Sequence, residues 1–293
     1  MKSIPLSEKI KLPLNKILCG DCLEILPTLP ANCIDLIVTS PPYADCRKKS
    51  YGGIHPHKYA EWLLLISREL KRVLKPEGSF VLNIKEKAAN GERYTYVIEL
   101  ILEMRKQGWL WTEEYIWCKK NCYPGKWPNR FRDAWERCLH FTKQTKFKMY
   151  QEKVMVPVGS WAEKRLSRLS QTDLRRDESN TISGFGKNVS NWVGREMVYP
   201  TNVLHLATEC SNKNHSAAFP TTLPMWFIKL FTVEGDIVLD PFMGSGTTAL
   251  ACKELNRKYI GIEIKKEYCE LAEKTLKEKY KPTLLDFIDE YQG

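Results

Sequence analysis

Long hydrophobic runs are missing from this chain of 293 residues. No apolar stretch approaches the ~20 residues that a membrane-spanning helix needs, so no membrane partner is expected. The N-terminal residues 1–14 also lack the apolar core of a secretory signal peptide. With 43% hydrophobic and 27% charged residues, the composition is typical of a globular protein that buries a full core. We therefore expect a cytoplasmic protein.

Metal-binding patterns are also missing. The chain contains 10 cysteines, which the cytoplasm keeps as reduced thiols rather than disulfides. Cys19 and Cys22 form one C-x-x-C pair, but neither a second such pair nor a histidine pair at zinc-finger spacing accompanies it. The sequence therefore predicts no metal site.

A glycine-rich loop is present without either of the common phosphate-binding motifs. Asp236–Asp240 is expected to be a strand, and a loop with Gly244 and Gly246 leads into a predicted helix, Ala249–Leu255. Strand, glycine loop and helix form the layout of a nucleotide-type site, because glycines let the backbone approach a ligand closely. Since there is no G-x-G-x-x-G and no Lys after the glycines, an adenosine without phosphates fits better than a phosphate-bearing ligand. An ordinary turn between a strand and a helix is the alternative.

The next predicted strand, Tyr259–Ile264, carries an acidic residue near its end. Glu263 is placed where a carboxylate binds both ribose hydroxyls of a nucleoside. This position supports the interpretation of the glycine loop as part of a nucleoside site.

A second motif follows the apolar run Ile34–Val38, which is expected to be a buried strand ending at two prolines. Thr39, Ser40, Pro41, Pro42 and Tyr43 then lie at the carboxyl end of a strand, where open α/β sheets bind ligands. The tyrosine ring can stack on a planar base, and the hydroxyl and carbonyl oxygens can accept hydrogen bonds from an exocyclic amine. A rigid turn after a core strand is the plainer alternative.

Together the two motifs resemble the amino-group DNA methyltransferases that use S-adenosylmethionine. The catalytic motif of that family is [Ser/Asp/Asn]-Pro-Pro-[Tyr/Phe/Trp], and its cofactor motif is Asp-Pro-Phe-x-Gly-x-Gly-Thr-Thr, which the chain carries from Asp240 to Thr248. The catalytic motif comes first, as in the β-class, and Ser in its first position is most typical of the N4-cytosine enzymes. The resemblance therefore implies N4-cytosine methylation, with N6-adenine methylation as the nearest alternative.

The resemblance also implies the residues of the site. The catalytic residues are Ser40, Pro41, Pro42 and Tyr43. The cofactor-binding residues are Asp21, Thr39, His215, Phe219, Pro220, Asp240, Pro241, Phe242, Gly244, Ser245, Gly246, Thr247, Thr248 and Glu263. His215–Pro220 resembles the segment His-Pro-Ala-x-Phe-Pro, with Ser216 in place of the usual Pro. Asp21 would accept from the adenine amino group, and it is also a good helix N-cap.

A further segment, Asn129–Phe141, resembles the family segment that lines the pocket for a flipped base. It carries a basic–acidic pair, then a Glu, then a predicted strand, Cys138–Thr142. A structural loop before an edge strand is equally compatible with this sequence.

Positive charge is concentrated in the middle of the chain. The net charge is +10, and most of it lies between Lys119 and Arg195, where four tryptophans are interleaved with the basic residues. Basic and aromatic residues together favour a nucleic-acid groove, and a solvated basic face is the alternative. The candidate contacts with double-stranded DNA are Arg47, Lys48, Lys49, Arg175, Arg176, Lys187 and Arg195.

We expect an α/β fold: a permuted Rossmann-like methyltransferase sheet with helices on both faces and an inserted target-recognition region. Residues 1–143 form the catalytic half, 144–212 the target-recognition insert, and 213–293 the cofactor half of one domain. Further strands are expected at Asn15–Cys19, Ser79–Ile84, Trp109–Trp117 and Val203–Leu206, and helices at Cys22–Leu29, Tyr59–Leu74, Tyr94–Gln107, Leu223–Phe231 and Lys265–Lys279, with a stop at Lys75–Gly78. The N-terminal strand is expected to lie beside the strand that ends with Glu263.

A restriction endonuclease acting on the same site is the expected functional partner, and the protein is expected to be a monomer or a homodimer. Two other classes of function stay open. One is a methyltransferase that acts on RNA, protein or a small molecule. The other is a nucleic-acid-binding module that keeps the fold without catalysis.

Overall fold

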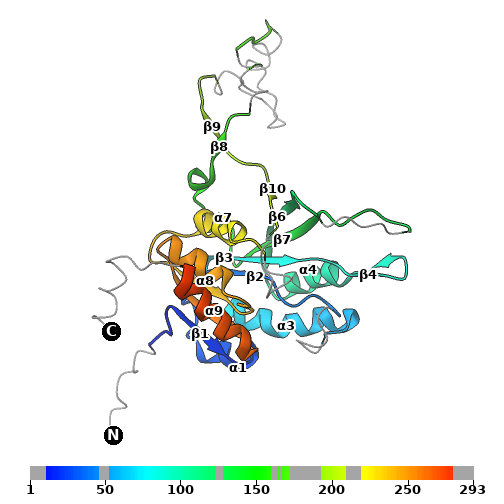
Figure 1. Cartoon of the computed structure of the whole chain (residues 1–293), viewed down its shortest axis with the longest axis vertical. Coiled ribbons are helices and arrows are strands. Elements are labelled where there is room, and N and C mark those ends of the chain that lie inside the picture. The colour runs from blue at the N-terminus through cyan, green and yellow to red at the C-terminus, as the bar shows by residue number, and fades with distance from the viewer. Residues whose placement is uncertain are drawn as a thin grey trace. The chain divides into compact units, whose positions relative to one another are not determined.

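An eight-stranded, mostly parallel sheet organises the part of the chain that the structure describes (Figure 1). The computed structural model describes residues 11–45, 53–122, 128–159, 164, 167–171, 193–208 and 219–279. From one edge to the other, the strands are β1 (Lys16–Cys19), β12 (Lys258–Glu263), β11 (Ile237–Asp240), β2 (Ile34–Thr39), β3 (Leu74–Ile84), β7 (Trp135–Thr142), β6 (Leu110–Lys119) and β10 (Val203–Leu206). Among these described strands β7 alone runs antiparallel to its neighbours.

The order of the strands confirms the permuted fold. The N-terminal strand β1 pairs in parallel with β12 near the C-terminus, and Cys19 lies opposite Glu263. The strand of the cofactor motif, β11, lies between β12 and β2, the strand of the catalytic motif. Because β1, β12, β11 and β2 are all parallel, the residues that follow them meet at one edge of the sheet.

Helices cover both faces of the sheet, as expected. On one face α1 (Cys22–Ile25), α3 (Pro56–Val73) and α4 (Tyr96–Lys106) share a buried core with Ile37 and Phe80. On the other side, α7 (Thr222–Phe231) and α8 (Thr247–Glu254) pack together, and α9 (Lys266–Lys279) packs against α8 and β1 (Figure 1). Successive strand residues point to opposite faces, so Val38 and Val81 face α7 while Ile37 and Phe80 face α3 and α4.

The observed elements differ most clearly from the predicted ones in three places. The strand predicted at Cys138–Thr142 begins at Trp135 and lies between β3 and β6, so the edge-strand alternative is wrong. The helix α3 ends at Val73, before the predicted stop at Lys75–Gly78, but the strand predicted at Ser79–Ile84 begins at Leu74, which already pairs with Ile34. The helix predicted from Cys22 ends at Ile25 and continues as a 3-10 turn, η1 (Leu26–Thr28), since Pro27 removes a backbone donor.

The chain divides into two compact units, residues 1–150 with 202–293, and residues 151–201. The first contains the main sheet and a short hairpin of β4 (Ala88–Ala89) and β5 (Glu92–Arg93). The described part of the second contains η2 (Gln151–Val154) and an antiparallel pair, β8 (Val156–Pro157) and β9 (Met197–Val198). No helix among the described residues is both long and apolar enough to cross a bilayer.

A buried histidine lies in the core of the first unit. The His140 ring is 4.5 Å from the Phe231 ring and 5.2 Å from the Phe147 ring, measured between centroids. Its Nε2 lies 3.0 Å from the Ser79 hydroxyl, while its buried Nδ1 has no hydrogen-bond partner among the described residues. Burial therefore lowers the pKa of His140 from 6.5 to about 3.

Because of the buried His140, we expect the folded protein to lose stability in acid. Below pH 6.5 the unfolded chain binds a proton at His140 that the folded chain does not bind, so stability falls as the pH decreases toward 3. Each pH unit costs at most about 1.4 kcal/mol. Urea unfolding between pH 7 and pH 5 should show a smaller pH dependence for His140→Phe than for the wild type. His205→Asn, a change at an exposed site, is the control. Equal slopes for wild type and His140→Phe would contradict the prediction.

Candidate active site and cofactor site

The Ser-Pro-Pro-Tyr motif lies directly after β2, where the sequence places it. All six residues of β2 are buried, so the strand fixes the position at which the motif begins. The Tyr59 hydroxyl donates a hydrogen bond of 2.9 Å to the carbonyl oxygen of Pro42. Tyr59 is fully buried on α3, so this contact ties the turn to the core. Tyr59 is a supporting residue that sequence reasoning missed, since an apolar helix face gave no reason to single it out.

The hydroxyl of Tyr43 is the centre of a hydrogen-bond network. It donates to Glu136 Oε2 at 2.5 Å, with Asn83 Oδ1 as a second acceptor at 3.2 Å. The Ser40 hydroxyl donates to the Tyr43 oxygen from 3.5 Å. Burial, and then the charge of Glu136, raise the pKa of Tyr43 well above its usual value of 10. The phenol therefore keeps its proton at neutral pH.

Glu136 is itself held by a lysine from the neighbouring strand. Lys119 Nζ lies 2.6 Å from Glu136 Oε1 and 5.1 Å from the centre of the Trp117 ring. The Glu136 residue is only 7% exposed. A buried carboxylate needs a partner of this kind. The sequence suggested Glu136 through a family segment, but it gave no signal for Asn83 or Lys119, which reach the site only through the order of β3, β7 and β6.

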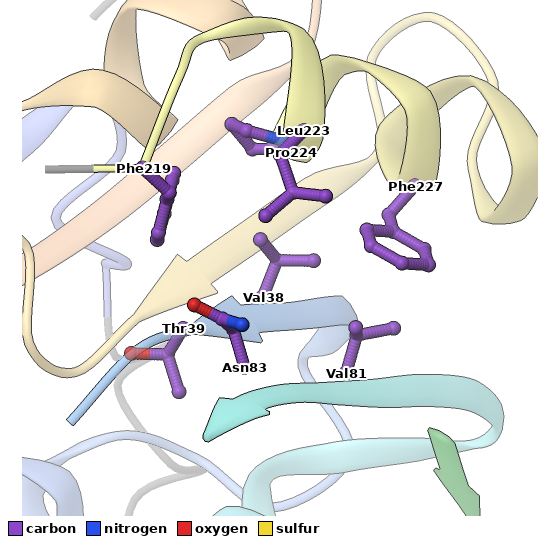
Figure 2. A pocket seen from close by; sticks show the side chains of 8 residues that line it. All are labelled: Val38, Thr39, Val81, Asn83, Phe219, Leu223, Pro224 and Phe227. Atoms are coloured by element: carbon purple, nitrogen blue, oxygen red, sulfur yellow. The ribbon is translucent and has the colours of Figure 1, made fainter. Parts of the chain in front are cut away.

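A small, mostly apolar pocket lies beside this network (Figure 2). Phe219 and the helix α7 form one wall, and the ends of β2 and β3 form the other. Its lining residues are Val38, Thr39, Val81, Asn83, Phe219, Leu223, Pro224 and Phe227. The pocket thus joins Phe219, from the predicted His215–Pro220 segment, to Asn83, a partner of Tyr43.

Asp240 connects the two motifs. Its Oδ1 accepts hydrogen bonds from the Thr39 hydroxyl at 2.5 Å and from the Phe242 amide at 3.0 Å, and its Oδ2 accepts from the Thr248 hydroxyl at 2.6 Å. Burial raises the pKa of Asp240 to about 6, although these three donors act in the opposite direction. The end of β2, the end of β11 and the first turn of α8 therefore share one buried carboxylate.

Glu263 organises the glycine loop. Its Oε2 accepts a hydrogen bond of 2.8 Å from the Gly244 amide, and its Oε1 accepts one of 2.9 Å from the Lys265 amide. Gly244 and Gly246 have φ angles of +55° and +88°, which residues with side chains rarely adopt. The loop therefore needs glycine at these positions for its own conformation, in addition to any approach of a ligand.

The other predicted cofactor residues of the first unit gather at the same edge of the sheet. Asp21 follows β1 and caps α1, with its Oδ1 accepting from the Leu23 amide at 2.8 Å. The Phe242 ring lies 5.7 Å from the Trp62 ring of α3. Pro241 and Pro220 are buried, and Phe219, Ser245 and Thr247 are half-buried.

These residues fit an adenosine-type cofactor. Asp21 follows β1, and Glu263 is the last residue of the adjacent parallel strand β12. Each carboxylate oxygen has more than one lone pair. Carboxylates at these positions suit an adenine amino group and ribose hydroxyls, which both donate hydrogen bonds. Among the described residues, no group of three or more His, Cys, Asp or Glu side chains gathers as it would around a metal ion.

Several predicted contact residues lie outside the described part of the chain. These are His215 of the cofactor set and Arg47, Lys48, Lys49, Arg175, Arg176 and Lys187 of the DNA set. Arg195 is described, and it is exposed in the second unit.

Comparison with known proteins identifies the family. The family model of a DNA methylase that covers N6 and N4 enzymes matches residues 34–274. The type II methyltransferase M.PvuII of Proteus hauseri is 32% identical over 272 residues, which cover 85% of this chain and 80% of that protein. The family match extends across the catalytic and the cofactor motifs.

Solved structures agree with this assignment. The PvuII DNA methyltransferase, described as cytosine-N4-specific, superposes with a TM-score of 0.66 at 28% identity, over 88% of this chain and 84% of that one. A Thermus thermophilus protein described as a "putative DNA modification methylase", complexed with S-adenosyl-L-methionine, has the same fold, with a TM-score of 0.58 at 23% identity over 90% of this chain and 93% of that one. The chain belongs to the N6/N4 DNA methylase family, and it is an S-adenosylmethionine-dependent DNA methyltransferase of the type found in restriction–modification systems.

Proposed function

We propose that this enzyme methylates the exocyclic N4 of cytosine in double-stranded DNA. The observation that carries the proposal is the hydroxyl of Ser40 at the start of the catalytic motif, where an acidic or amide residue is typical of N6-adenine enzymes. The similarity to a methyltransferase described as cytosine-N4-specific supports the same choice. N6-adenine methylation is the second candidate, because a hydroxyl and a carboxylate both present an acceptor oxygen to an amine.

In this proposal the target base leaves the duplex and stacks on Tyr43, which costs a few kcal/mol of base pairing and stacking. Ser40 and the carbonyl region of Pro41 accept hydrogen bonds from the exocyclic amine and orient its lone pair. When bound, S-adenosylmethionine supplies the methyl group. Orientation of the two reactants accounts for most of the acceleration, and no covalent enzyme adduct is needed since the exocyclic nitrogen is the nucleophile.

The cofactor site that we propose follows the edge of the sheet described above. Glu263 binds the ribose hydroxyls, and Asp21 accepts a hydrogen bond from the adenine amino group. The backbone of the loop around Gly244 and Gly246 closely approaches the cofactor. Phe219 and Pro220, with His215, enclose the methionine end. The shared buried contacts of Asp240 hold this site beside Ser40.

DNA binding is proposed for the basic middle of the chain, with residues 144–212 as the target-recognition insert. Arg195 is one candidate for contact with a phosphate, because it is exposed and lies in this region. A restriction endonuclease that cuts the same sequence is the proposed functional partner.

Nucleoside analysis tests the base assignment. Unmethylated bacterial genomic DNA is incubated with the enzyme and S-adenosylmethionine that carries a deuterated methyl group, digested, and analysed by chromatography and mass spectrometry. N4-methylcytosine with the deuterium label is the expected product, and it must be separated from the C5 isomer. A Ser40→Ala variant is the control for contaminating activity. Labelled N6-methyladenine would overturn the cytosine assignment while leaving the enzyme class intact.

A further inference from the structure

The methylation reaction releases a proton, and two hydrogen-bond contacts lead from Ser40 through Tyr43 to Glu136. The proposed nucleophile is an amine that carries two hydrogens, of which one must leave when the nitrogen gains a methyl group. A hydrogen-bonded acceptor for that proton contributes typically about 10²- to 10⁴-fold to the rate of such a step. The Ser-Pro-Pro-Tyr motif itself contains no base, since a serine hydroxyl and a tyrosine phenol both hold their protons at neutral pH.

The donors of the network all point the same way. The Ser40 hydroxyl donates to the Tyr43 hydroxyl, and the Tyr43 hydroxyl donates to Glu136. The first of these contacts is 3.5 Å, longer than an ordinary O–H···O hydrogen bond, and the second is 2.5 Å. Catalytic hydrogen bonds are often long before substrate binds, and they tighten in the reacting complex. The chain of donors therefore starts at Ser40, the proposed partner of the amine, and ends at a carboxylate.

Glu136 supplies the carboxylate that accepts the hydrogen bond of Tyr43. Asn83, the other acceptor of the Tyr43 hydroxyl, is a neutral amide and does not titrate. Lys119 donates to the opposite carboxylate oxygen at 2.6 Å, so it holds the side chain in place and leaves Oε2 directed at Tyr43. The charge of Glu136 also acts on two other titratable groups, Lys85 and Cys138.

We infer that Glu136 is the terminal proton acceptor of the methyl transfer, acting through Tyr43 and Ser40. The carbon–nitrogen bond forms as the bond from the methyl carbon to sulfur breaks, and that electron pair stays on sulfur. One nitrogen–hydrogen bond breaks, and its proton passes to the Ser40 oxygen while Ser40 gives its own proton to Tyr43. Tyr43 gives its proton to Glu136 in the same movement, so no tyrosinate forms, in keeping with the raised pKa of that phenol. The inference rests on the proposed methylation of an exocyclic amine and applies equally to cytosine and adenine.

The test is Glu136→Gln, which keeps the shape of the side chain and an acceptor for Tyr43 but removes the base. The single-turnover rate of methylation should fall about 100-fold, and its solvent deuterium isotope effect should increase because proton transfer becomes limiting. The affinity for S-adenosylmethionine, measured by calorimetry, should stay unchanged. Base flipping, measured by the fluorescence of 2-aminopurine at the target position, should also persist.

Two further variants separate a proton path from a structural role. Glu114→Gln is the matched control. Glu114 lies on β6, forms an ion pair with Arg137 of β7 and does not contact Tyr43. Removal of the Glu114 charge should therefore leave the methylation rate unchanged. In Glu136→Gln/Asn83→Asp a carboxylate takes the place of the amide that lies 3.2 Å from the Tyr43 hydroxyl, and part of the lost rate should return.

The outcomes distinguish this inference from the proposed function. A wild-type rate in Glu136→Gln, or a loss of cofactor affinity and base flipping in proportion to the rate, would overturn the proton path. The comparison uses whichever methylated nucleoside the wild type forms, so N6-methyladenine as product would overturn the cytosine assignment and leave this test valid.

Discussion

Gly246→Ala is expected to unfold the cofactor loop and to abolish binding of S-adenosylmethionine. A Cβ atom at Gly246 would lie 2.9 Å from the Cβ and 3.2 Å from the Cα of Ala272 on α9, and the backbone φ there is +88°. The left-handed conformation costs an L-residue about 1–2 kcal/mol and overpacking a further 1–3 kcal/mol, so a loss of about 2–5 kcal/mol is expected. Urea unfolding measures this loss, and calorimetry measures the cofactor affinity.

A second substitution divides this cost into its two parts. Ala272→Gly removes one of the two clashing atoms, so the double variant Gly246→Ala/Ala272→Gly should recover part of the stability and keep the strain from φ. The control is Ala272→Gly alone, which carries the helix cost of glycine, about 1 kcal/mol. If the double variant were as unstable as the sum of the two single variants, the contact between the loop and α9 would not be the cause.

The sequence determined the architecture well because its signals were local. Buried apolar runs followed by turn residues marked the strands that end at Thr39, Asp240 and Glu263, and helical spacing marked α3 and α4. Parallel strands place their carboxyl ends at one edge, so the meeting of these residues followed from the fold class. The place of β1 beside β12 followed from the permuted order of the motifs.

The contacts around Tyr43 were beyond the reach of the sequence for a physical reason. Asn83 and Lys119 lie 36 residues apart in the chain, and they meet Glu136 and its neighbours only because β7 lies between β3 and β6. The register of an antiparallel strand decides which of its side chains face which neighbour, and no local pattern fixes that register. The same limitation explains why the start of β7 at Trp135 was missed.

Asp240→Ala is expected to destabilise the protein strongly. Among substitutions that remove a side-chain contact in the cofactor motif, its effect should be the largest. It leaves three hydrogen-bond donors, the hydroxyls of Thr39 and Thr248 and the amide of Phe242, without their common acceptor in a site that is 1% exposed. Each unsatisfied buried group costs about 1–3 kcal/mol, and the two hydroxyls can turn to other acceptors, so a loss of about 4 kcal/mol is expected. The affinity for S-adenosylmethionine, measured by calorimetry, should fall more than about tenfold, because this carboxylate joins β2, β11 and α8.

Graded variants test whether the shared carboxylate is the cause. In Asp240→Asn the amide oxygen can still accept from Phe242 and Thr39, while the Thr248 hydroxyl can turn to accept from the amide nitrogen, so the loss should be about 1–2 kcal/mol. Thr248→Ser, which keeps the hydroxyl, is the control and should have nearly the stability of the wild type. Thr248→Val, which removes the hydroxyl, should be less stable. The order expected from urea unfolding is therefore Asp240→Ala as the least stable, then Asp240→Asn and Thr248→Val, then Thr248→Ser. Equal stability of Asp240→Ala and Thr248→Ser would show that other contacts hold the two motifs together.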